Sequence, residues 1–264
     1  MIELINKRKA NEKHFLKDNG NIEIQLFKDN IHYLKNGNYE EISNVLNEKD
    51  EIIENTENDY KVNFNKKNAS IKYIKDDNYL EFTPKKAKNI DCIIEKNTKE
   101  LSSVLYKDIF ENLDIEYILS FFGVKENIII KDAIDISKLE FDINTNLSLS
   151  LQNNVLIAKK KDIIIFSFNV PYMKDSLGEE SNDVSYNLKE KNKKYIFSIS
   201  YSLNWIKSND RKFPIVIDPN YENNTNVEDT YIYPGDTNDV RYNRIYLNAG
   251  VEKVNNQDVV NRAL

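Results

Sequence analysis

Alternation of apolar and polar residues with a period of two most limits what this chain can fold into. Ile22, Ile24 and Leu26 are separated by single polar residues, and the stretches 139–151 and 195–203 repeat this pattern. Because side chains alternate across a strand, each stretch predicts a strand with one buried face and one face in water. The sequence therefore predicts an all-β fold, with antiparallel sheets in a large β-sandwich-like domain.

Turn sequences between the alternating stretches predict how the strands connect. Asn19-Gly20 and Asn36-Gly37 are dipeptides that tolerate the positive φ angles of a tight hairpin. Asp76–Asn78 and Asn153-Asn154 offer similar turn chemistry. We predict a hairpin at each of these four turns. Roughly a dozen or more short strands in all would be the pattern of a sandwich or a large open antiparallel sheet.

Two stretches are candidates for helix. Residues 44–57 are polar and charged with a few apolar positions, and residues 100–119 begin with apolar side chains at helical spacing. The second stretch also contains Asp114–Ile118, which alternates as a strand does. We predict helix for the first stretch and for the start of the second, and strand for the rest of the second.

Prolines near residue 218 indicate a domain boundary. Phe213–Pro219 is a short strand-like run bracketed by prolines, which are excluded from central ladders. The division predicted is residues 1–219 as one β-rich module and residues 220–264 as a linker with the incomplete start of a second β-sandwich. The second part is near the lower limit of length for independent folding, and Val259–Leu264 has the pattern of an opening strand.

Composition excludes several classes of protein. The net charge is −6, and lysines alternate with acids along the chain, so no basic stripe indicates nucleic-acid binding. No apolar run reaches the roughly 18 residues of a membrane span, and no apolar segment of a secretory signal follows the basic N-terminus. Cys92 is the one cysteine, which excludes an intrachain disulfide framework, and it is expected to be a buried, inert thiol.

Motifs that carry catalysis or bind a cofactor are missing from the sequence. The chain has six glycines, and it contains neither a phosphate-binding loop nor a nucleophile elbow. His14 and His32 are its two histidines and fall on neighbouring expected strands. With a carboxylate they could bind zinc, but no third ligand can be named, so ordinary strand residues are the favoured interpretation. We predict no catalytic residues, no metal site, no cofactor and an unknown ligand site.

Other residues suggest weaker candidates. Glu179, Glu180 and Asp183 lie in a loop that could hold an ion or ligand, although a loop tethered by its turn residues is favoured. Tyr73, Tyr195, Tyr201 and Trp205 are expected in the core, whereas Tyr231, Tyr233, Tyr242 and Tyr246 are the candidate exposed set. Asp236, Asp239 and Asn243 surround Gly235 and could offer oxygen ligands to calcium, with turn formation as the favoured interpretation.

Several segments together resemble a known family. They are Gly123–Ile130, Pro171–Asp175 with Gly178-Glu179, Val184–Leu188 and Phe213–Pro219, with Lys13–Asp18, Ile31–Tyr33 and Tyr39–Ile42 upstream. Their order resembles the N-terminal β-rich region of Gram-positive Rhs/YD-repeat proteins of the wall-associated type. The tail, residues 227–264, resembles the start of a DNRLRE-type domain, which is similar to carbohydrate-binding modules.

This resemblance implies a non-catalytic structural or adhesive module of a large bacterial protein. It implies an extracellular or cell-surface location, although this chain carries no signal peptide. The partners expected are downstream domains of the same polypeptide and cell-wall polysaccharide, with no nucleic acid and no membrane span. The alternative hypothesis is a carbohydrate-active hydrolase that uses two of the 43 Asp and Glu residues as a catalytic pair.

Overall fold

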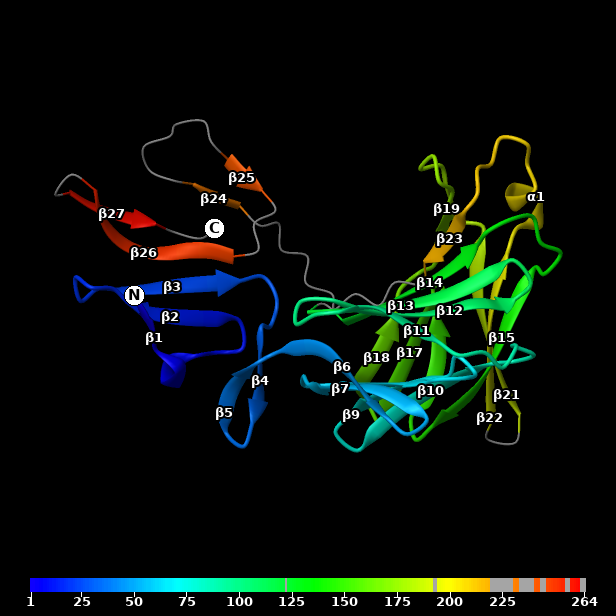
Figure 1. Cartoon of the computed structure of the whole chain (residues 1–264), viewed down its shortest axis with the longest axis horizontal. Coiled ribbons are helices and arrows are strands. Elements are labelled where there is room, and N and C mark those ends of the chain that lie inside the picture. The colour runs from blue at the N-terminus through cyan, green and yellow to red at the C-terminus, as the bar shows by residue number, and fades with distance from the viewer. Residues whose placement is uncertain are drawn as a thin grey trace. The chain divides into compact units, whose positions relative to one another are not determined.

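The computed structural model is almost entirely β-structure in antiparallel sheets. It describes the backbone of residues 1–121, 123–191, 194–218, 230–232, 240–242, 246–254 and 257–261, and the side chains of residues 1–121, 123–190 and 194–218. The chain divides into two compact units, with residues 1–42 and 224–264 in unit 1 and residues 43–223 in unit 2. Figure 1 shows the strands of both units.

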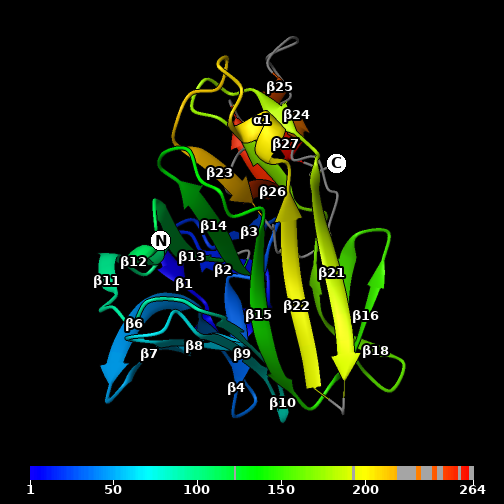
Figure 2. The same cartoon turned by 90° about the vertical axis from the view of Figure 1, so that its right-hand side faces the viewer.

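Unit 2 contains an eight-stranded sheet in the order β21-β22-β15-β10-β9-β8-β7-β6, and Figure 2 shows β21, β22 and β15 side by side. The strands are β6 (Ser43–Lys49), β7 (Ile52–Glu57), β8 (Lys61–Asn65), β9 (Ile71–Lys75), β10 (Asn78–Pro84), β15 (Lys138–Thr145), β21 (Val184–Lys191) and β22 (Lys194–Tyr201). The alternation predicted in residues 139–145 and 195–201 is confirmed. Leu139, Phe141 and Ile143 of β15 are buried. Their partners on β22 are Ile199, Phe197 and Tyr195, in that order.

A seven-stranded sheet, in the order β11-β12-β13-β14-β23-β19-β20, and a three-stranded sheet, β16-β17-β18, complete unit 2. Their strands are β11 (Ile93–Asn97), β12 (Ser102–Phe110), β13 (Leu113–Ser120), β14 (Gly123–Ile130), β16 (Ser148–Gln152), β17 (Val155–Lys160), β18 (Ile163–Phe168), β19 (Tyr172–Lys174), β20 (Glu180–Ser181) and β23 (Ile215–Asp218). One short helix, α1 (Leu203–Ile206), follows β22, with the Ser202 hydroxyl accepting the amide proton of Trp205 at its start.

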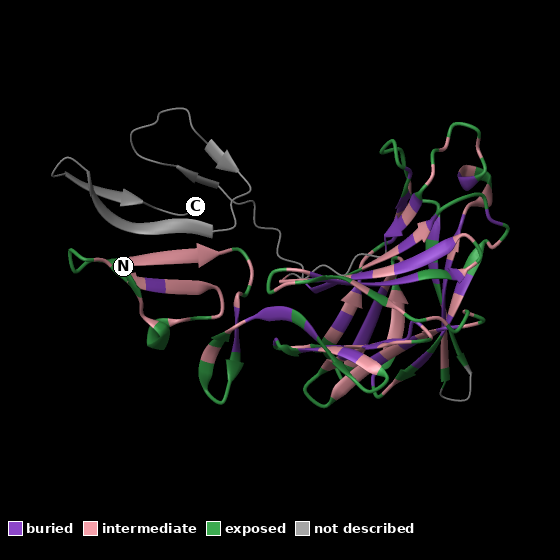
Figure 3. Ribbon diagram, in the orientation of Figure 1, coloured by how far each residue is buried: buried purple, intermediate pink, exposed green. Residues whose placement is uncertain are grey.

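Aromatic side chains join the sheets of unit 2 into one core. The rings of Phe64 on β8 and Tyr117 on β13 lie 5.5 Å apart between centroids, so the eight- and seven-stranded sheets face each other. Tyr73 and Phe82 contact Phe168 of the three-stranded sheet at 5.5 and 5.3 Å. Figure 3 shows the buried residues concentrated on the strands and the exposed residues at the turns. The predicted sandwich-like fold is confirmed.

Unit 1 is built from short strands. Its sheets have the orders β1-β2-β3-β26-β27, β4-β5 and β24-β25. The elements are β1 (Ile2–Glu3), the 3-10 turn η1 (Ile5–Lys7), β2 (Glu12–Leu16), β3 (Ile22–Phe27), β4 (His32–Lys35), β5 (Asn38–Glu41), β24 (Thr230–Ile232), β25 (Val240–Tyr242), β26 (Tyr246–Val254) and β27 (Gln257–Asn261). The predicted division at residues 219 and 220 stays a prediction.

The four predicted hairpins are all present, and each turns where a residue adopts positive φ. Gly20 has φ 83° between β2 and β3, and Gly37 has φ 82° between β4 and β5. Asp76 has φ 52° between β9 and β10, and Asn153 has φ 49° between β16 and β17.

Both helix predictions are wrong. Residues 44–57 form most of the β6–β7 hairpin, which turns at Asp50 with φ 49°. Leu46 on β6 and Ile53 on β7 enter the core, so the apolar residues serve two short strands instead of one helical face. The start of 100–119 is β12, where Ser102–Tyr106 are buried on both faces. Consecutive buried residues hide the period of two that identifies a strand.

Candidate functional site

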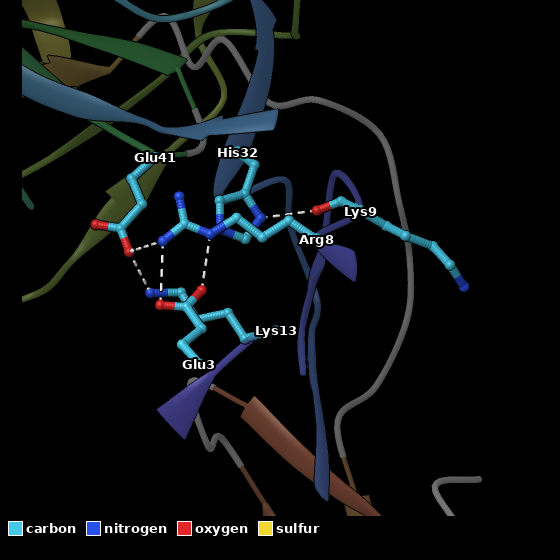
Figure 4. A network of polar contacts seen from close by, with 6 residues as sticks. All are labelled: Glu3, Arg8, Lys9, Lys13, His32 and Glu41. Atoms are coloured by element: carbon cyan, nitrogen blue, oxygen red, sulfur yellow. Dashed lines mark hydrogen bonds and ion pairs between the residues drawn. The ribbon is translucent and has the colours of Figure 1, made fainter. Parts of the chain in front are cut away.

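Five charged or titratable side chains meet in unit 1, four of them from different strands and one from the residue after η1. Glu3 is on β1, Arg8 follows η1, Lys13 is on β2, His32 is on β4 and Glu41 is on β5. Figure 4 shows these five side chains with Lys9, and we call the five the Arg8 cluster. All five belong to the described part of unit 1.

Backbone contacts of the 8–10 segment hold the cluster together. The N–H of Arg8 donates to the Ile5 carbonyl and closes η1 at 3.1 Å. The carbonyl of Ala10 then accepts the N–H groups of Ile31 and His32 at 2.9 and 3.0 Å, which fixes the start of β4 beside this segment. Arg8 and His32 therefore come together through the backbone and not through a shared strand.

Arg8 connects two carboxylates from separate strands. Its Nε and one Nη donate to the two oxygens of Glu3 at 2.7 and 3.1 Å, and the same Nη donates to Glu41 at 3.2 Å. The Lys13 ammonium donates to the same Glu41 oxygen at 2.5 Å. Side-chain exposure ranges from 11% for Arg8 to 27% for Glu41, so water screens these pairs less than it screens a surface ion pair.

The hydrogen bonds set the charge state of the cluster. The hydrogen bond from Arg8 is the largest influence on Glu3 and, against the effect of burial, lowers the pKa of this carboxyl. The reciprocal hydrogen bond raises the pKa of Arg8. The ionised forms of Glu3 and Arg8 thus stabilise each other.

His32 is neutral and has one nitrogen without a partner. It is 2% exposed, and its Nδ1 lies 2.7 Å from the Lys9 carbonyl, so Nδ1 carries the proton and donates it there. Nε2 is buried and has no hydrogen-bond partner. Burial, aided by the nearby charges of Arg8 and Lys13, lowers the pKa of this imidazole, although the Lys9 carbonyl raises it. The site therefore presents an unprotonated nitrogen beside two carboxylates.

The structure separates the two histidines considered for zinc. His14 lies on β2 opposite Ile24, and its Nε2 is 3.0 Å from Glu12. His32 instead has Glu3 and Glu41 beside it, with one ligand atom from each of the three residues within 4.8 Å of the others. His32, Glu3 and Glu41 come from three strands, so no local motif could have revealed this combination.

The loop after β19 is organised by a residue that the sequence did not single out. The Asp175 carboxylate, whose side chain has 0% exposure, accepts the N–H groups of Leu177 and Glu179 at 3.0 Å and that of Lys212 at 3.3 Å. Glu180 pairs with Lys174 at 3.0 Å, and Asp183 is exposed. Asp175 thus ties this loop to the 208–212 segment.

The remaining candidates fall in varied surroundings. Cys92 is half-buried before β11, and burial raises the pKa of its thiol. Tyr73 and Tyr201 are buried, Tyr195 is half-buried, and Trp205 on α1 lies under the Arg211 guanidinium at 4.7 Å. The tail candidates lie outside the residues whose side chains the structure describes: Tyr231, Tyr233, Tyr242, Tyr246, Gly235, Asp236, Asp239 and Asn243.

A half-buried carboxyl in unit 2 was also missed. Glu126 on β14 lines a small cavity with Ile71 of β9 and the aromatic side chains of the core. Burial raises the pKa of Glu126 to about 7, and the nearby Asp218 adds to this, although a hydrogen bond from Tyr117 lowers it. Glu126 lies between Lys125 and Asn127 in the sequence, yet it shares a strand face with the buried Ile128.

Comparison with known proteins identifies the family. The model of a domain of unknown function, DUF7948, matches residues 4–220. The chain belongs to this family. No solved structure matches the chain.

Three curated relatives align with 82% of the chain while the alignment covers 10% of each relative. The tRNA3(Ser)-specific nuclease WapA of Bacillus spizizenii is 25% identical over 245 residues. The tRNA nuclease WapA of Bacillus subtilis and the tRNA(Glu)-specific nuclease WapA of Bacillus subtilis subsp. natto are each 24% identical. The chain therefore spans about a tenth of the length of these relatives.

These findings correct several predictions made from the sequence. The family that matches is DUF7948, and the findings do not support the Rhs/YD-repeat and DNRLRE-type resemblances. The predicted non-enzymatic adhesive module conflicts with relatives that are named nucleases, as does the alternative of a carbohydrate-active hydrolase. The expected partners, with cell-wall polysaccharide and no nucleic acid, conflict with relatives that are named for tRNA.

Proposed function

We propose that this chain is a segment of a larger polypeptide that cleaves tRNA. The observation that carries the proposal is the alignment of 82% of the chain with three proteins that are each named as tRNA nucleases. The small share of each relative that is matched supports a polypeptide of several parts.

Among the described residues, the Arg8 cluster has the side-chain types that suit phosphodiester hydrolysis best. A neutral imidazole such as His32 can accept a proton from an attacking hydroxyl or water. Guanidinium and ammonium groups such as Arg8 and Lys13 bind phosphate oxygens and stabilise charge in the transition state. Glu3 and Glu41 occupy these cations at 2.5–3.2 Å, so a phosphate would compete with two carboxylates. We propose that this cluster contacts the RNA, with phosphate displacing the two carboxylates from Arg8 and Lys13.

The test uses the complete polypeptide and labelled total tRNA. We expect the wild-type protein to cut tRNA, His32→Gln to cut it more slowly and His14→Gln to match the wild type. His14 is the matched control because it lies on the neighbouring β2 and pairs with Glu12 instead of the cluster. Intact tRNA with the wild-type protein would overturn the proposal. Equal cleavage of tRNA by the wild type and both variants would show that the Arg8 cluster takes no part in the cleavage.

We propose an extracellular or cell-surface location as well. In the part of the chain that the structure describes, no helix is long and apolar enough to cross a membrane. A tRNA nuclease that was free in the cytoplasm of its producer would destroy the producer's own tRNA, which favours export. Detection of the polypeptide in the cytoplasmic fraction alone would contradict this location.

A further inference from the structure

The unpartnered nitrogen of His32 is the least satisfied atom of the Arg8 cluster. A buried nitrogen with a lone pair and no hydrogen bond destabilises the fold when nothing compensates it. Its position is nevertheless fixed, since Nδ1 donates to the Lys9 carbonyl at 2.7 Å. A backbone carbonyl that orients an imidazole through Nδ1 is the arrangement by which proteins aim Nε2 at a metal ion.

Two carboxylates lie close to the imidazole of His32. Glu3 and Glu41 each place an oxygen such that these oxygens and a His32 nitrogen all fall within 4.8 Å of one another. Because Nδ1 is engaged, Nε2 is the nitrogen left for a ligand. Metal–ligand bonds of 2.0–2.2 Å would bring such atoms to about 3.4 Å apart, a closure that two flexible glutamates can make.

We infer that Glu3, His32 and Glu41 form a binding site for one divalent transition-metal ion. Zinc represents the class, because imidazole with carboxylates suits zinc and its neighbours. Calcium and magnesium prefer ligand sets made of oxygen alone. Three protein ligands would leave one coordination position for water. An ion bound to Nε2 would replace the proton-accepting role proposed for His32, because Nε2 has one lone pair for either role. Metal binding is measured without RNA, so its failure is distinct from a failure of the proposed cleavage of tRNA.

Arg8 and Lys13 compete with the ion for the carboxylates. Lys13 reaches Glu41 at 2.5 Å with a side chain that is 22% exposed, so it can leave toward water. Arg8 is more enclosed, at 11% exposure, and holds Glu3 at 2.7 Å. Removing the competing ammonium should therefore tighten metal binding, an effect that a purely structural ion-pair network would not produce.

The experiment is calorimetric titration of the 264-residue chain with zinc chloride, with cobalt(II) absorption as a second readout of ligand geometry. We expect one ion per chain for the wild type and tighter binding for Lys13→Gln. His32→Gln should weaken binding at least tenfold, since even the partners of metal ligands contribute 10–100-fold. His14→Gln, which changes the other histidine, should bind within about twofold of the wild type.

Circular dichroism confirms that each variant is folded. Glu41→Gln, which keeps the shape of the side chain, provides a second test if His32→Gln does not fold. Absence of zinc binding by the wild type would overturn the inference. Undiminished binding by His32→Gln would also overturn it, because the ion would then be held at an adventitious surface site. An equal loss of binding in His14→Gln would overturn it as well, because the loss would then not be specific to His32.

Discussion

The hydroxyl of Tyr117 donates a 3.2 Å hydrogen bond to Oε1 of Glu126, its direct partner across β13 and β14. Tyr117 is fully buried, and Glu126 faces the cavity that Phe82 and Phe168 also line. A carboxyl group therefore lies against an aromatic core with one strong donor. Such a group is easier to bury protonated than ionised.

Glu126 should make the stability of unit 2 depend on pH. Its pKa of about 7 lies above the 4.5 of an ordinary glutamate, mainly because of burial, so the folded chain holds this proton more tightly than the unfolded chain. The free energy of unfolding should therefore fall as pH rises from about 4.5 to about 7, by up to about 3 kcal/mol at 1.36 kcal/mol per pKa unit. Urea unfolding at about pH 5.5 and pH 8 measures the part of this difference that falls above pH 5.5, about 2 kcal/mol.

Glu126→Gln should remove that part of the pH dependence, because glutamine has no proton to lose in this range. Glu95→Gln is the control, since Glu95 lies on β11 of the same sheet with a side chain that is 43% exposed. An unchanged pH dependence in Glu126→Gln would show that Glu126 does not titrate between the two pH values.

The same substitution at two buried tyrosines should have opposite consequences. The Tyr106 hydroxyl donates to the Asn65 carbonyl at 2.6 Å, so Tyr106→Phe leaves that carbonyl unpaired and should cost about 1–3 kcal/mol. The Tyr186 hydroxyl is buried without a partner, so Tyr186→Phe should be neutral or stabilising. Urea unfolding of both variants at one pH measures the two changes. A cost at Tyr186 equal to that at Tyr106 would contradict the assignment of these hydrogen bonds.

Local signals predicted the fold well. The hairpins at Gly20 and Gly37 were visible because each turn chemistry is contained in two adjacent residues. The β6–β7 hairpin was missed because its turn at Asp50 has neither glycine nor asparagine beside it, whereas each predicted turn contains one of these residues. β12 was missed because both of its faces are buried.

The candidate site could not be predicted in the same way. Glu3, His32 and Glu41 are distant in sequence, and what joins them is the backbone of Ala10, which accepts from Ile31 and His32. Contacts between segments that are distant in sequence depend on the whole fold, so no regular spacing of residues in the sequence indicates them. Glu126 was missed because it lies in the polar run Lys125–Asn127, where nothing marks it as a residue that lines the core cavity.

Asp175→Asn should release one side of the loop that Asp175 organises. An asparagine oxygen can still accept from Leu177 and Glu179, but its NH₂ group would face the Lys212 N–H and Arg211, which both need an acceptor. Amide hydrogen exchange should therefore quicken around Lys212 more than at Glu179.

Asp183→Asn is the control, since Asp183 is exposed in the same connection before β21. Equal acceleration at Lys212 and Glu179 in Asp175→Asn would mean that the loop opens as a unit. The backbone N–H groups and Arg211 outweigh the effect of burial and lower the pKa of Asp175. This support should be lost when the pH falls through that lowered pKa.

Arg8→Lys should weaken unit 1 although it keeps the charge. Arg8 spans both oxygens of Glu3 and reaches Glu41, whereas an ammonium is a point charge that cannot reproduce the planar fork. We expect a loss of about 1 kcal/mol, seen as roughly fivefold faster amide exchange in β1 and β5. Lys9→Gln is the control, because Lys9 pairs with Glu12 from a side chain that is 63% exposed and should contribute only a few tenths of a kcal/mol. If Lys9→Gln and Arg8→Lys quickened exchange equally, the half-buried fork of Arg8 would contribute no more than a surface ion pair.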